Sequence, residues 1–203
     1  MTHLYRKVSF GSKVNFECLM CGQCCSNGPN LGLTAFDILR IANYLGIEWR
    51  ELRGKYIVAV IADLTAIPVL RDKGGGRCVF LENREGKAYC RIYPARPMRC
   101  RLYPFIPYSP SDNHTLYLDE CCPGIKTDKT IEPPWNTLEK YNFEARIHYS
   151  KIYTLTFKKG FEPLEALEKS VEEIAALFSM ESAKGKHLRQ GSASQEQLYV
   201  PAS

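Results

Sequence analysis

Nine cysteines constrain this chain more than any other feature, and four of them, Cys18, Cys21, Cys24 and Cys25, lie within eight residues. The other five are Cys78, Cys90, Cys100, Cys121 and Cys122. Thiolates grouped this closely are typical of sites for zinc or for iron–sulfur clusters. Apolar packing gives no reason for such a grouping, so all nine cysteines are candidate metal ligands.

The remaining composition is that of an ordinary globular domain. With 203 residues and a hydrophobic content of 45%, the chain can bury a core without help from a metal. Its formal net charge of +5 is modest and spread along the chain, which gives no indication of nucleic-acid binding.

The compartment decides how the cysteines are interpreted. The first residues contain no apolar stretch of the length that a signal peptide needs, and no segment approaches the ~20 apolar residues of a membrane span. We therefore expect a cytoplasmic protein without membrane attachment, in which cysteines bind metal more often than they form disulfides. An odd number of cysteines also fits a disulfide framework poorly.

The order of helical and extended patterns predicts an α+β fold. We expect a small cysteine-rich metal-binding core, built from the cysteine knuckle, a β-hairpin and a proline-rich loop, with flanking helices. The predicted boundaries place this core in residues 1–130 and a helical segment packed on it in residues 131–180. Residues 181–203 are polar and small, which predicts a disordered tail.

Local signals mark the individual elements. Thr34 and Asp37 form an acidic variant of the capping box at the start of a helix that Gly46 ends. The predicted elements are a helix over residues 35–45, hairpin strands over 78–82 and 87–92, a helical turn near 98–102, and helices over 137–157 and 163–180.

The knuckle has the spacing of a ferredoxin run with one ligand missing. Cys18, Cys21 and Cys24 match the first three cysteines of the bacterial ferredoxin pattern. Gly28 and Pro29 stand where the fourth cysteine and its proline would be. A remote cysteine therefore has to complete the site.

The adjacent cysteine pairs favour more than one metal centre. Neighbouring side chains in extended backbone point in opposite directions, so Cys24 and Cys25 cannot easily serve one tetrahedral ion. The same holds for Cys121 and Cys122. Either one member of each pair is a packed thiol, or each pair bridges two sites. Two four-thiolate sites would use eight of the nine cysteines; one cluster with exchangeable ligands is the other option.

The spacing favours iron–sulfur over zinc. Structural zinc sites usually combine two CxxC knuckles, and this chain has one. Scattered ligands suit a cluster, whose irons are spread over several ångströms. We predict a 4Fe–4S cluster, with zinc as the alternative. The radical S-adenosylmethionine motif is not met, because Cys18, Cys21 and Cys25 have its two spacings in the reverse order.

Several motifs together resemble a known family. They are the run from Cys18 to Cys25, the Gly76-x-Cys78-x-Phe80-Leu81 stretch, and the Arg96-Pro97-x-x-Cys100-Arg101-x-Tyr103-Pro104 string. This combination, over about residues 15–125, resembles the CxxCxxCC (YkgJ-like) proteins, described as zinc- or iron-chelating. One branch of them is similar to flagellin lysine N-methylase, a considerably longer enzyme. The resemblance implies metal binding, and through that branch S-adenosylmethionine as a further cofactor.

Four arginines lie beside cysteines in the sequence: Arg91, Arg96, Arg99 and Arg101. They are candidates to bind an anionic substrate or the carboxylate of S-adenosylmethionine. The favoured interpretation is that Arg91, Arg99 and Arg101 compensate the negative charge of a thiolate cluster. Arg96, followed by proline, is expected to set the turn that aims Cys100. The four histidines are isolated, and none is predicted to be a ligand.

The sequence therefore predicts a cytoplasmic iron–sulfur protein, with one or two 4Fe–4S centres, in redox or cluster-dependent modification chemistry. The alternatives are a structural zinc protein that forms an interaction module, and an S-adenosylmethionine-dependent protein lysine methyltransferase. If the protein is an enzyme, it is an oxidoreductase or such a methyltransferase. Its partner is a protein or a small-molecule substrate that the sequence does not identify.

Overall fold

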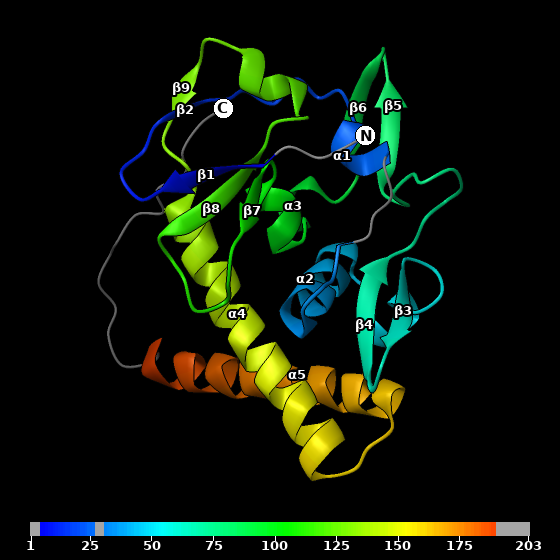
Figure 1. Ribbon diagram of the computed structural model, residues 1–203. Helices are drawn as coiled ribbons and strands as arrows, with labels where there is room; N and C mark the ends of the chain where they lie inside the picture. Colours follow the sequence, from blue (N-terminus) through cyan, green and yellow to red (C-terminus); the bar gives the residue numbers. More distant parts are fainter. Residues whose placement is uncertain (1–4, 27–30, 190–203) are drawn as a thin grey trace.

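The computed structural model describes residues 5–26 and 31–189 and confirms an α+β fold (Figure 1). The N-terminal two thirds consist of short strands and short helices, whereas two long helices form the rest. The strands are β1 (Tyr5–Ser9), β2 (Val14–Asn15), β3 (Ile57–Ala62), β4 (Thr65–Leu70), β5 (Leu81–Arg84), β6 (Lys87–Cys90), β7 (Phe105–Pro107), β8 (Thr115–Asp119) and β9 (Thr130–Ile131). The helices are α1 (Gln23–Ser26), α2 (Ala35–Leu45), α3 (Met98–Leu102), α4 (Trp135–Tyr153) and α5 (Pro163–Arg189), with 3₁₀ turns η1 (Trp49–Leu52), η2 (Tyr93–Ala95) and η3 (Pro123–Lys126) and a π-helical segment η4 (Thr154–Lys158).

The strands form four small antiparallel sheets. The largest has the order β1–β8–β7, and the others are the pairs β2–β9, β3–β4 and β5–β6. The β5–β6 hairpin pairs Leu81 with Cys90 and turns at Glu85 and Gly86, both with positive φ. This is the predicted hairpin, with its strands shorter than expected.

Two hydrophobic clusters hold these elements together. The first lies among α2, β4, β5 and α5, with Ile41, Phe80 and Ile174 at its centre. The second lies between the β1–β8–β7 sheet, α3 and the first half of α4, where Leu102, Leu116 and Leu138 are fully buried. Since α4 runs from that sheet to its crossing with α5, it connects both clusters (Figure 1).

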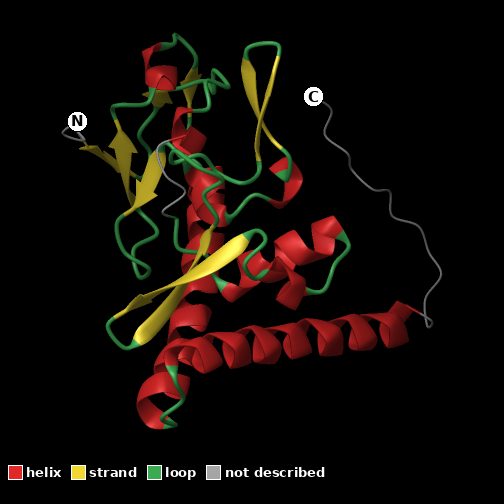
Figure 2. Cartoon of the chain, turned by 90° about the vertical axis from the view of Figure 1, so that its right-hand side faces the viewer, coloured by secondary structure: helices red, strands yellow, loops and turns green. Residues whose placement is uncertain are grey.

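The long helices differ in detail from the prediction. α4 begins at Trp135 and gives way to the π-helical segment after Tyr153. α5 begins at Pro163 as expected but continues to Arg189, well beyond the predicted end of the helix at Met180 (Figure 2). The helix therefore includes the start of the segment that was expected to be disordered, and residues 190–203 lie outside the described residues. No helix within the described ranges is long and apolar enough to cross a bilayer.

Candidate metal centre

The cysteine knuckle is a tight turn followed by one turn of helix. Met20 and Gly22 both adopt left-handed backbone conformations, with φ of 52° and 74°. Gly22 also lies so close to the hairpin that a Cβ there would come within 2.7 Å of the Ala88 Cβ. The following residues, including Cys24 and Cys25, form α1. The expected Gly-assisted turn is present, and the Gly28–Pro29 step after it lies outside the described residues.

Two backbone hydrogen bonds attach the β5–β6 region to the knuckle. The N–H of Ala88 donates to the carbonyl of Met20, and the N–H of Cys78 donates to the carbonyl of Cys25, each at 2.8 Å. Cys90 ends β6, two residues after Ala88. These contacts bring two remote cysteines to the side of the knuckle that carries Cys25.

The Cys121–Cys122 segment is attached to the beginning of the knuckle. The N–H of Glu17 donates to the carbonyl of Gly124 at 3.0 Å, and the Gln23 side chain donates to the carbonyl of Cys121 at 3.3 Å. A Cβ on Gly124 would come within 2.3 Å of the Glu17 carbonyl oxygen, so only glycine permits this approach. Asp119 fixes the segment by accepting a hydrogen bond from the Cys121 N–H.

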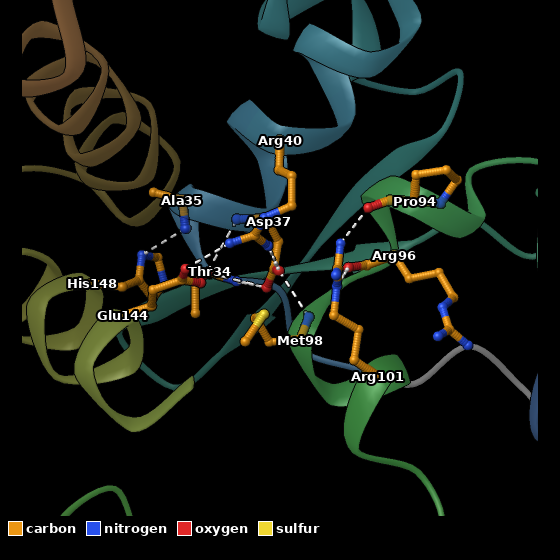
Figure 3. Close-up of polar contacts among 10 residues, drawn as sticks. All are labelled: Thr34, Ala35, Asp37, Arg40, Pro94, Arg96, Met98, Arg101, Glu144 and His148. Carbon is orange, nitrogen blue, oxygen red and sulfur yellow. Dashed lines mark hydrogen bonds and ion pairs between the residues drawn. The ribbon is translucent and has the colours of Figure 1, made fainter. Parts of the chain in front are cut away.

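Cys100 reaches the region on α3, whose position depends on Asp37. The Asp37 carboxylate is buried and accepts hydrogen bonds from the N–H of Met98, the first residue of α3, and from the N–H and hydroxyl of Thr34 (Figure 3). The capping box expected at Thr34 and Asp37 is therefore confirmed. Through its bond with the Met98 N–H, the Asp37 carboxylate also fixes the position of α3, the helix that carries Cys100.

Electrostatic interactions link the thiols in two sets that share Cys24. The charges of Cys24, Cys25, Cys78, Cys90 and Cys100 act on one another. In the second set, the charges of Cys18, Cys21 and Cys24 act on Cys122. We call Cys25, Cys78, Cys90 and Cys100 the hairpin group, and Cys18, Cys21 and Cys122 the entry group. Cys24 is close to both, while Cys121 adjoins the entry group through the bond from Gln23.

The thiol pKa values reflect this crowding. A hydrogen bond from Cys25 lowers the pKa of Cys24 to about 7, and the same bond raises the pKa of Cys25. Burial is the main cause that raises the pKa of Cys78, Cys90 and Cys100, and like charge from neighbouring thiolates adds to it. Several thiolates in one partly buried place are costly unless a cation neutralises them.

The adjacent thiols are closer than the sequence indicated. The Sγ atoms of Cys24 and Cys25 lie 3.8 Å apart, because these residues are on α1 and not in extended backbone. Sulfurs bound at 2.3 Å to one tetrahedral ion are separated by about 3.8 Å. The assumption that this pair points in opposite directions is therefore wrong.

A family model described as "Putative zinc- or iron-chelating domain", CxxCxxCC, matches residues 17–123. The chain belongs to the CxxCxxCC family. The matched residues include all nine cysteines and end just after Cys122, so the family region coincides with both thiol groups.

One curated protein similar to this chain is an uncharacterized protein of Methanocaldococcus jannaschii. The two are 33% identical over 106 residues, which is 49% of this chain and 52% of the relative. The chain thus spans about half the length of the relative that it matches. No solved structure matches the chain.

A buried hydrogen-bond donor beside the cysteines of this CxxCxxCC domain fits a bound metal–thiolate group. Arg96 Nε is buried and has no hydrogen-bond acceptor among the described residues, while the charge of Arg96 favours the thiolates of Cys24 and Cys90. A buried donor without an acceptor is rare in folded proteins. A bound sulfide or thiolate would supply that acceptor. As they stand, no three Cys, His, Asp or Glu side chains in the described part of the domain are arranged around a metal ion.

The four predicted arginines have different surroundings. Arg96 stacks on the Tyr93 ring at 3.7 Å, and its charge acts on Cys24 and Cys90. Arg91 is exposed and packs over Tyr56 and Phe80. The positive charge of Arg99 opposes the rise in the pKa of Tyr141 of α4 that burial causes. Arg101 donates hydrogen bonds to the carbonyls of Pro94 and Arg96 (Figure 3). Among the four arginines, Arg96 is therefore the one that combines an effect on two thiols with a buried donor lacking an acceptor among the described residues.

Sequence reasoning did not identify a buried polar network that joins α2, α3 and α4. Arg40 forms ion pairs of 2.6 Å with Asp37 and with Glu144, and the N–H of Ala35 donates to His148 Nδ1 (Figure 3). Glu144 and His148 are four residues apart on the buried side of α4. The i, i+4 spacing of Glu144 and His148 on one helix face is the sequence signal that could have indicated this network.

Proposed function

We propose that this chain is a metal–thiolate protein that binds an iron–sulfur cluster of the 4Fe–4S type in redox or cluster-dependent modification chemistry. The observation that supports it most directly is the approach of cysteines from four separate segments: the knuckle, the hairpin, α3 and the loop after β8. Clusters accept ligands spread in this way more readily than single ions do.

Two centres fit the thiols better than one. The hairpin group offers Cys25, Cys78, Cys90 and Cys100, and the entry group offers Cys18, Cys21 and Cys122, with Cys24 adjoining both and Cys121 nearby. The hairpin group thus offers four thiols, and the entry group reaches four with Cys24 or Cys121, which is the number that a four-thiolate site needs.

A bound cluster would supply one-electron chemistry. The chain's own residues do the rest: the bonds from Ala88 and Cys78 fix the knuckle, and Asp37 fixes the helix of Cys100. Arg96 offers a charged donor to the bound group, and the Tyr93 ring covers that guanidinium on one side. Such donors stabilise cluster charge and tune its potential.

The experiment is purification without oxygen, followed by a visible spectrum and assays of iron, zinc and acid-labile sulfide per chain. We expect thiolate-to-iron absorption, with ~4 iron and ~4 sulfide for each cluster. Cys90→Ser and Cys18→Ser separate the two groups and serve as each other's control. With two centres, each variant keeps about half of the metal; equal and complete loss from both variants indicates one shared centre.

A structural zinc site is the second candidate, since the 3.8 Å separation of the Cys24 and Cys25 sulfurs suits one tetrahedral ion. Zinc without colour or sulfide in the same assays would establish it and refute the cluster. Calorimetric titration of these samples with S-adenosylmethionine tests the methyltransferase alternative, for which absence of binding heat is a negative result.

A further inference from the structure

A cavity of about 480 Å³ lies among α2, α3 and the beginning of α4. The residues that line it are Arg40, Met98, Arg101, Asn136, Thr137 and Lys140. Three of these side chains are cationic, two more offer hydrogen bonds, and none is a carboxylate. The volume is within the range of sites that hold small organic molecules.

Two of the cations are held in place by the protein itself. Arg40 is fixed by its ion pairs with Asp37 and Glu144, and Arg101 is fixed by the carbonyls of Pro94 and Arg96 (Figure 3). These bonds leave other N–H groups of each guanidinium available, because each has five donors. Donors fixed in advance lose little freedom when a ligand binds, which favours binding.

The balance of charge around the cavity is positive. The positive charges of Arg40 and Arg96 disfavour the charged form of Arg101, and the carboxylates of Asp37 and Glu144 favour it to a lesser extent. Both carboxylates are already engaged with Arg40. Lys140 is exposed, and its charge acts on Glu144, whose carboxylate is bonded to Arg40. The Lys140 ammonium itself is in no ion pair among the described residues.

The start of α4 adds to the attraction for an anion. The first turn of this helix contains no acidic residue, and its N-cap Pro134 makes no side-chain hydrogen bond. Asn136 and Thr137 come from this turn. The partial positive charge of a helix N-terminus thus acts on the same space as the three cationic side chains.

We propose that this cavity binds a small organic anion, whose carboxylate or phosphate group is held by Arg101 and Lys140 with hydrogen bonds from Asn136 and Thr137. Guanidinium and ammonium groups bind both kinds of oxyanion. Arg101 directly follows Cys100, so the ligand lies on the same short helix as one of the candidate thiols. The proposal does not rest on a metal, because every residue in it belongs to the folded chain.

The test is isothermal titration calorimetry of the full chain, purified without oxygen, with inorganic phosphate and separately with succinate at constant ionic strength. We expect saturable binding of at least one of them. Lys140→Ala removes one charged contact and weakens binding about tenfold. Since Lys140 is exposed, this variant keeps the fold.

Lys159→Ala is the matched control. It removes the same charge from an exposed lysine beyond the other end of α4, roughly 25–30 Å away along the helix axis, and leaves binding unchanged. Binding of phosphate alone identifies a phosphate-bearing ligand, and binding of succinate alone identifies a carboxylate. Binding of both indicates recognition of charge.

Absence of saturable binding by either anion in the millimolar range would overturn the proposal. An equal loss in Lys140→Ala and Lys159→Ala would do the same, since it would reveal a general charge effect. Metal content is assayed in the same samples. Failure of the metal proposal therefore appears as absent metal with binding intact, and failure of this one as intact metal without binding.

Discussion

Two regions of the molecule gather ionisable groups, and they differ in how far the chain satisfies them. The Asp37 carboxylate accepts hydrogen bonds from Thr34, Met98 and Arg40, and within that region Glu144 Oε2 is the buried oxygen without a donor. In the cysteine region the thiols interact mainly with one another, and the buried Arg96 Nε has no acceptor within residues 5–26 and 31–189. The first region is complete as folded apart from that one oxygen, whereas the second has a charged donor for which a bound metal–thiolate group would supply the acceptor.

Metal removal gives the largest expected difference between these regions. The amides of Ala88 and Cys78 bond to the knuckle, whereas the Met98 amide bonds to Asp37. A structural metal contributes apparent binding energies on the order of 10 kcal/mol to folding. After chelation we therefore expect hydrogen-exchange protection at Ala88 and Cys78 to fall by orders of magnitude, while Met98 retains most of its protection.

The Met98 amide is the internal control for that experiment. Equal loss of protection at all three amides would mean that both regions depend on the metal. Unchanged protection at Ala88 and Cys78 would mean that the knuckle is held without one. Either result would contradict the difference between the two regions.

Asp37→Ala tests the complete region. The substitution leaves the Met98 and Thr34 amides without their acceptor in a buried place. Arg40 loses one of its two carboxylate partners and keeps Glu144. Breaking a buried ion pair by removing one partner costs about 3–5 kcal/mol, and we expect a loss near 3 kcal/mol because Arg40 is partly exposed. The free energy of unfolding in urea measures it.

Glu51→Ala is the control for the cap alone. Glu51 accepts a hydrogen bond from the Glu48 N–H at the start of η1, but the bond is exposed. We expect a cost of about 0.5–1 kcal/mol for losing it. If both variants cost the same, the Asp37 network adds nothing beyond an ordinary helix cap.

His148 makes the complete region sensitive to acid. Burial lowers its pKa from 6.5 to about 4, and its side chain is 2% exposed. Between about pH 6.5 and pH 4 the unfolded chain binds a proton at this residue and the folded chain does not, so stability falls as the pH falls. The total loss from this group is about 3 kcal/mol.

The measurement compares wild type with His148→Gln in urea unfolding at a series of pH values. The variant lacks this titration, so its stability should decline less in that window. His114→Gln, at an exposed position, should follow wild type. Identical slopes for all three proteins would show that His148 titrates normally in the folded state.

The sequence predicts the parts of this structure that depend on neighbouring residues. Thr34 and Asp37 are three positions apart, and their reciprocal bonds follow from helix geometry, so the capping box could be foreseen. The β5–β6 hairpin has a local turn for the same reason. The residue type and spacing of the cysteines were enough to indicate a thiol-rich region.

The contacts between distant segments could not be predicted in this way. The Arg40–Glu144 pair and the bond from Gln23 to Cys121 join residues about a hundred positions apart, and no local pattern encodes them. The division of the thiols follows from where the hairpin and the β8 loop attach to the knuckle. The expectation for Cys24 and Cys25 was wrong because it assumed extended backbone where the chain forms α1.

Arg96→Gln gives the smallest effect and tests whether the cysteine region is completed by a cluster. The substitution removes a positive charge that favours the thiolates of Cys24 and Cys90, while an amide can still stack on Tyr93. Because the oxidised cluster carries less negative charge than the reduced one, losing this cation lowers the reduction potential. We expect a shift of roughly 1 kcal/mol, or about 40 mV for one electron, in a potentiometric titration. Arg91→Gln is the matched comparison. Arg91 is exposed, and its charge acts on Cys90 less strongly than that of Arg96, so we expect a smaller shift. A larger shift in the Arg91 variant would assign the charged donor to the wrong arginine, and no shift in either would mean that the buried Nε of Arg96 does not face the cluster.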